Sequence, residues 1–299
     1  MHPDRVVVRG FSAGTVAAGI KKRGGEDLVL IVSDRECAAA GVFTTNSVKA
    51  APVLLSMDRA AGGKARAVLV NSGNANACTG ASGLAAAERS GQAVAGALGI
   101  DPRQVLLAST GVIGAPLDAA KIENAMPSLV ESLNREGLTD AAGGIMTTDS
   151  FPKISVFDGK AAGFPYRIAG IAKGAGMIMP HMATMLCFVI TDIDISAGNL
   201  KEILVRAVDC TLNRITVDGD TSTNDTVLIL ANGEAGNPVL HREGLENFET
   251  GLTAVLGELA RMVVKDGEGA TKVVEVEIRG ADNADEAERA ARTGAHSSL

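Results

Sequence analysis

Short apolar runs alternate along this chain with clusters of small polar residues, and this arrangement restricts the fold strongly. Strands are predicted at residues 28–33, 42–45, 66–70, 105–108, 147–157, 166–171, 185–191, 227–231 and 273–278. Helices are predicted at residues 81–99, 117–135, 199–212, 244–264 and 283–293. The two kinds of element mix without a strict βα repeat. The pattern therefore favours an α+β fold in which helices cover sheets.

The composition excludes several classes of protein. Hydrophobic residues make up 46% of the 299 residues and charged residues 21%, as in ordinary globular proteins. No apolar run reaches the roughly 18 residues that a transmembrane helix needs. Residues 1–30 lack the apolar core of a signal peptide, so we expect a cytoplasmic protein without membrane partners. The net charge of −7 and the absence of Trp argue against a nucleic-acid partner.

Cysteine and histidine are scarce. The four cysteines form no CxxC pair, so the sequence predicts neither a disulfide framework nor a metal site: Cys37, Cys78, Cys187 and Cys210. Of the four histidines, His2 and His296 lie near the termini, and no motif supports His181 or His241 as a catalytic base. We expect chemistry that does not depend on histidine.

Polar clusters beside the predicted strands are the candidate sites. They comprise residues 71–80, 109–114, 146–153, 173–184, 213–226 and 265–272. Taken singly, each is equally well explained as a turn or a helix cap. The order of residues in Lys173–Gly176 does not fit a Walker phosphate loop, and residues 213–226 do not fit an EF-hand. For residues 213–226 we expect a hydrogen-bonded network that supports a site.

The stretch before the strand at 185–191 offers a different chemistry. Cleavage of the Ala183–Thr184 bond would give Thr184 a free α-amine at the start of a rigid strand. An unperturbed α-amine has a pKa of roughly 7.7–8.0, so it can accept the proton of its own hydroxyl group. Such an N-terminal nucleophile needs no histidine. The small residues of Ser109–Gly114 would let backbone N–H groups face an oxyanion.

In combination, these clusters resemble the ornithine acetyltransferase family, also called glutamate N-acetyltransferase. The matching stretches are VNSGNANACTG, STGVIG, IMTTDSFPK, KGAGMIMPHMATML, NRITVDGDTSTNDT and DGEGATK. The resemblance begins near Gly10 and runs to the last residue. Family members continue beyond the segment matched by residues 291–299, so we expect this chain to lack their C-terminal part.

The resemblance implies roles for particular residues. Thr184 corresponds to the nucleophile and Ala183–Thr184 to the self-cleavage site, while Thr110 and Gly111 correspond to the oxyanion hole. Substrate-binding positions correspond to Lys173, to Glu268 and to one of Thr147 and Thr148, of which we favour Thr147. His181 stands where the family more often has Asn; we favour a tolerated change over an altered cleavage rate or a pH-dependent step.

The resemblance also implies a fold and an activity. The fold is a layered αββα sandwich like that of N-terminal-nucleophile enzymes, cleaved into an α-chain region, 1–183, and a β-chain region, 184–299. The implied activity moves an acetyl group from N-acetylornithine to glutamate, with acetyl-CoA as a further donor in some members and no other cofactor. Two α and two β chains are expected to assemble. The alternatives are an amidohydrolase or aminopeptidase on a related scaffold and an inactive truncated relative.

Overall fold

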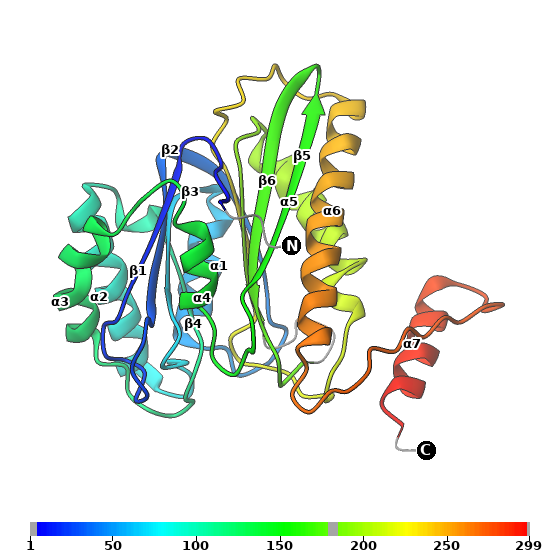
Figure 1. The fold of residues 1–299 in the computed structure, drawn as a ribbon, viewed down its shortest axis with the longest axis horizontal. Coiled ribbons are helices and arrows are strands. Elements are labelled where there is room, and N and C mark those ends of the chain that lie inside the picture. The colour runs from blue at the N-terminus through cyan, green and yellow to red at the C-terminus, as the bar shows by residue number, and fades with distance from the viewer. Residues whose placement is uncertain (1–4, 179–184, 298–299) are drawn as a thin grey trace.

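The structure is a computed structural model that describes residues 5–178 and 185–297 (Figure 1). The strands are β1 (Phe11–Val16), β2 (Leu28–Phe43), β3 (Lys64–Asn71), β4 (Val105–Ser109), β5 (Lys153–Ala161), β6 (Phe164–Lys173), β7 (Leu186–Thr191) and β8 (Thr226–Ala231). The helices are α1 (Ala51–Ala61), α2 (Gly80–Leu98), α3 (Ala119–Glu131), α4 (Leu138–Gly144), α5 (Ala197–Asp209), α6 (Arg242–Lys265) and α7 (Ala284–Ala295).

The strands form one 8-stranded sheet in the order β4-β3-β2-β8-β7-β6-β5, with β1 also paired to β2. Strand β2 joins the two halves of this sheet. Its residues 28–32 pair with β1 and β3, whereas its residues 38–43 pair with β8. The register shifts between Val32 and Cys37, and such an irregularity lets a strand bend. The sheet can therefore fold back on itself at β2.

Three hydrophobic clusters show that this folded sheet makes four layers. Val29 and Ile31 of β2 share one cluster with Phe188 of β7, so the two sheet halves pack face to face. The alternate residues Leu28 and Leu30 pack instead against α2 and α3. On the other side, β7 and β8 pack against α5 and α6. Figure 1 shows α2 and α3 flanking one half and α6 flanking the other. The predicted αββα sandwich is confirmed.

Most predicted elements are present, but three predictions need correction. The strand predicted at residues 147–157 begins only at Lys153, because residues 147–152 form turns and bends. Residues 42–45 do not begin a separate strand, because Val42 and Phe43 end the long strand β2. Residues 273–278 are not a strand: they have no regular structure, and Val273, Val274 and Val276 are exposed. The alternation of Val and Glu is that of a half-buried strand, but no described strand pairs with it. Helix α7 follows, apart from the layers (Figure 1).

One edge of the sheet gathers the ends of several strands. Lys173, at the end of β6, pairs with Leu186 at the start of β7, and Leu186 pairs with Thr226 at the start of β8. Asn71 and Ser109, at the ends of β3 and β4, also pair with each other. The polar clusters of the sequence follow or precede these ends. Among the described residues, no helix is long and apolar enough to cross a membrane.

Candidate active site

Lys173 is the central cation at this edge. Its side chain is buried, and its Nζ lies 3.4 Å from the hydroxyl of Thr110 and 4.0 Å from a carboxylate oxygen of Asp149. Burial lowers the pKa of Lys173, and the charge of Asp149 opposes this effect only in part. An ammonium has three donors, and the described residues offer Lys173 only these two long contacts. The arrangement can therefore receive an additional anion.

A second buried lysine lies beside it. Lys153 is fully buried, and its Nζ donates to Asp149 at 2.7 Å and to Asp266 at 2.6 Å. Asp149 also accepts the backbone N–H of Gly174 at 2.7 Å. Burial raises the pKa of Asp149, but the charges of Lys173 and Lys153 outweigh it, so the pKa lies below its ordinary value. The carboxylate of Asp149 thus stays ionised between the two lysines.

The turn after β4 carries Thr110 and Gly111. The backbone N–H of Thr110 donates to Asn71 at 2.9 Å, whereas that of Gly111 donates to none of the described residues. Gly111 has a φ of +131°, and a Cβ there would lie 2.5–2.7 Å from the backbone of Gly73 and Asn74. Only glycine fits this turn. Among the described residues, the Gly111 N–H and the Thr110 hydroxyl are therefore the hydrogen-bond donors of this turn that a ligand oxygen could use.

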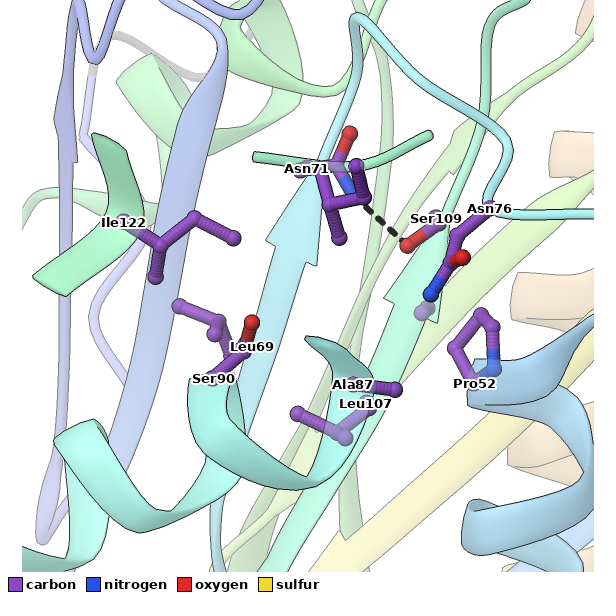
Figure 2. Close-up of a pocket in the computed structure, with 11 residues that line it drawn as sticks. Pro52, Leu69, Asn71, Asn76, Ala87, Ser90, Leu107, Ser109 and Ile122 are labelled. Atoms are coloured by element: carbon purple, nitrogen blue, oxygen red, sulfur yellow. Dashed lines mark hydrogen bonds between the residues drawn. The ribbon is translucent and has the colours of Figure 1, made fainter. Parts of the chain in front are cut away.

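The space behind this turn is filled. Figure 2 shows Asn71 donating to the hydroxyl of Ser109, at 2.6 Å, across the ends of β3 and β4. The pocket that these side chains line has a volume of only about 10 Å³, which is about enough for one water molecule. It cannot hold an amino acid, so the Lys173 side of the turn is the better candidate for a binding site.

One loop anchors the chain on both sides of residues 179–184. Upstream, Asp218 accepts the backbone N–H of Met177 at 2.5 Å and that of Ile178 at 2.8 Å. Downstream, the fully buried Asp225 accepts the N–H of Met185 at 3.0 Å. Burial raises the pKa of Asp225 well above its ordinary value, although the Met185 N–H opposes this. The hydrogen-bonded network predicted for residues 213–226 is confirmed.

The structure brings Thr110 and Glu268 close to Lys173. Glu268 is exposed, its N–H donates to Ala175 at 2.7 Å, and its carboxyl lies where a Cβ on Gly176 would be. Its charge acts on Lys173. The exposed Thr147 donates its N–H to Asp149 at 3.0 Å. Thr148 makes no side-chain hydrogen bond to the described residues. Ala183, Thr184 and His181 lie outside the described residues.

Asp149, Lys153, Asp225 and Asp266 were not among the predicted site residues. All four stand within the polar clusters of the sequence, so their neighbourhood was visible. The burial of Lys153 was not, because its partner Asp266 lies 113 residues further along the chain. Among the described residues, no group of His, Cys, Asp and Glu could hold a metal ion.

Comparisons with known proteins show the family of this chain. The model of the ArgJ family matches residues 12–299. The arginine biosynthesis bifunctional protein ArgJ of Geobacter sulfurreducens is 54% identical over 294 residues, which are 98% of this chain and 75% of that protein. A crystal structure of ornithine acetyltransferase from Mycobacterium tuberculosis, complexed with ornithine, has 38% identity and a TM-score of 0.51. It covers 58% of this chain and 92% of its own.

A more distant structure agrees on the fold alone. The L-aminopeptidase D-Ala-esterase/amidase of Ochrobactrum anthropi, described as a new variant of the Ntn hydrolase fold, has 11% identity and a TM-score of 0.52. It covers 87% of this chain and 85% of its own. The sandwich is thus of the kind seen in N-terminal-nucleophile hydrolases. By sequence along nearly its whole length, and by fold, the chain belongs to the ArgJ family.

Proposed function

We propose that this chain transfers an acetyl group from N-acetylornithine to glutamate through an acetyl-Thr184 intermediate, as a step in arginine biosynthesis. The observation that carries the proposal is the under-partnered cation of Lys173. It lies beside the Thr110 hydroxyl, at the end of β6, opposite the start of the strand that Thr184 precedes. Both substrates are amino acids with a carboxylate that such a cation can bind.

The nucleophile is freed by cleavage of the Ala183–Thr184 bond, which divides the chain into regions 1–183 and 184–299. The solved chain from Mycobacterium tuberculosis supports this division. Almost all of that chain, 92%, aligns with only 58% of the present chain. The aligned part is thus similar in length to region 1–183, as expected if the solved chain is one product of such a cleavage. After cleavage, the pairing of β6 with β7 would hold the two regions in one sheet. Asp218 and Asp225 would keep the anchored backbone on either side in place.

Acetyl transfer then has two steps. The Thr184 hydroxyl attacks the acetyl carbonyl carbon, and its proton passes to the free α-amine of Thr184. The oxyanion accepts hydrogen bonds from the Gly111 N–H and the Thr110 hydroxyl. When the C–N bond breaks, ornithine leaves with that proton. The amine of glutamate attacks acetyl-Thr184 in the same manner, which restores the Thr184 hydroxyl and gives N-acetylglutamate.

Substrate recognition divides between opposite charges. Lys173 binds the substrate carboxylate, and Glu268, on the exposed side of the site, binds an ammonium group. Thr147 is preferred to Thr148 as a further contact, because its backbone is tied to Asp149 beside Lys173. This scheme needs no cofactor other than acetyl-CoA as an optional donor. A cytoplasmic assembly of two α and two β chains completes the proposal.

The experiment is an acetyl-transfer assay on the purified chain. N-acetylornithine and glutamate are supplied, and both N-acetylglutamate and free acetate are measured. The proposal predicts N-acetylglutamate with ping-pong kinetics, and no transfer by Thr184→Ala. Acetate without N-acetylglutamate would favour the amidohydrolase alternative. A chain that forms neither product would be an inactive relative, and transfer by Thr184→Ala would remove Thr184 from its role.

A further inference from the structure

Two adjacent side chains immediately before β8 connect the two halves of the proposed site. We propose that Asn224 and Asp225 are positioning residues that together fix the start of β7 relative to the oxyanion turn. The inference rests on the proposed function, which places the nucleophile just before β7 and the oxyanion hole in the turn of Thr110 and Gly111. Neither residue is placed in contact with the reacting atoms.

Asn224 holds the turn side. Its side-chain amide donates to the backbone carbonyls of Ser109, at 2.8 Å, and Ala75, at 2.7 Å. Ser109 directly precedes Thr110, and Ala75 belongs to the loop that Gly111 packs against. The side-chain carbonyl of Asn224 accepts the Thr223 hydroxyl at 2.6 Å. An amide suits this position because it offers two donors and one acceptor, and an aspartate would set an oxygen against two carbonyls.

Asp225 holds the strand side. Its Oδ1 accepts the N–H of Met185, the residue after Thr184, and its backbone carbonyl accepts the N–H of Thr44. The hydroxyl groups of Ser222 and Thr44 also act on this carboxyl, as does the charge of Lys173, although Oδ2 itself completes no hydrogen bond with the described residues. The Met185 N–H is therefore the best-defined partner of the carboxyl among the described residues, at 3.0 Å. This contact ties the carboxyl to the residue that precedes β7.

The consequence is a short and rigid connection. Asp225 binds the Met185 N–H, and its neighbour Asn224 binds the Ser109 carbonyl. Both residues are buried, and they directly precede the central strand β8. A nucleophile and an oxyanion hole must keep their separation closely, because a misplacement of about 1 Å can reduce a rate by roughly 10²-fold. Asn224 and Asp225 would supply that constraint.

The test compares Asn224→Asp with a matched control, Asn237→Asp. Asn237 lies beyond the opposite end of β8 and is equally buried, at 5% exposure. Its amide also donates to two backbone carbonyls, those of Asp194 and Pro238, at 2.9 and 3.0 Å. Both variants should lose similar thermal stability. Only Asn224→Asp should lower kcat, by about 10²-fold, with KM for N-acetylornithine unchanged.

A second pair of variants decides the matter if Asn224→Asp does not fold. Asp225→Asn keeps a side-chain carbonyl for the Met185 N–H and should retain most of kcat, whereas Asp225→Ala should lose it. Equal kcat values within each pair would overturn the positioning proposal. A wild-type kcat in Asn224→Asp beside an inactive Thr184→Ala would overturn only this inference. An active Thr184→Ala would instead overturn the proposed nucleophile.

Discussion

Lys153 and Lys173 lie on neighbouring strands, share the carboxylate of Asp149 and are both buried, yet their surroundings differ. Lys153 has carboxylate oxygens of Asp149 and Asp266 at 2.7 and 2.6 Å. Lys173 has its nearest carboxylate at 4.0 Å and a hydroxyl at 3.4 Å. Close carboxylates surround the Lys153 ammonium, whereas the described residues give the Lys173 ammonium only long contacts. The first is a structural group, whereas the second is suited to a ligand.

The difference between the two lysines shows which buried charges indicate a functional site. A buried ion pair with complete partners is weak evidence for a site, because the fold itself uses the charge. A buried cation with only long contacts has lost its water without gaining close partners, which costs stability. Such a cost is expected at functional sites, where the missing partner is a ligand. Separate measurements of stability and of substrate binding distinguish these two situations.

The largest effect is expected for Lys153→Met. This change leaves the carboxylates of Asp149 and Asp266 buried without their shared cation, which should destabilise the fold by about 3–5 kcal/mol. Thermal or urea denaturation measures the loss. A variant as stable as the wild type would contradict the structural role of Lys153 and remove the contrast between the two lysines.

Lys173→Met should have the opposite pattern. Asp149 remains paired with Lys153, and a poorly compensated buried charge disappears, so stability should stay constant or rise. Substrate binding should weaken by about 1.5–3 kcal/mol, the range for a hydrogen bond to a charged group. KM for N-acetylornithine and the denaturation midpoint are measured on the same preparation. An unchanged KM would remove Lys173 from substrate binding.

The pH dependence gives a smaller and more specific signal. Lys173 has a pKa below its ordinary value of 10.5 because of burial, so it loses its charge at a lower pH than an exposed lysine. Carboxylate binding requires that charge and is lost as the pH rises through the lowered pKa. KM should therefore increase on the alkaline side, before pH 10.5. In Lys173→Arg this increase should be absent, since arginine stays protonated there. Identical profiles would assign the change to another group.

Much of the fold was predictable because the strands carry strong local signals. The apolar runs at 66–70, 185–191 and 227–231 are central strands that are buried on both faces, so composition alone identifies them. The prediction of a strand at 273–278 was wrong. Alternating apolar and polar residues show that a segment suits a half-buried strand, but not that a neighbouring strand is there to pair with it. Whether a neighbouring strand exists is a property of the tertiary structure.

The site was predictable to a different degree. Thr110, Gly111, Lys173 and Glu268 stand in clusters whose composition is unusual beside a strand, and the structure brings them to one edge. Which of the neighbouring polar residues support them could not be read from the sequence. Asn224 donates to the carbonyl of Ser109, 115 residues away, and such a contact leaves no local pattern.

The central claim is that Thr184 becomes an N-terminal nucleophile and carries the acetyl group. The most direct measurement is the intact mass of the denatured protein before and after mixing with N-acetylornithine alone. We predict two chains that divide at Ala183–Thr184. After mixing, the C-terminal chain should be heavier by one acetyl group, which is attached to Thr184. A single uncut chain, or two chains of which neither gains an acetyl group, would contradict it.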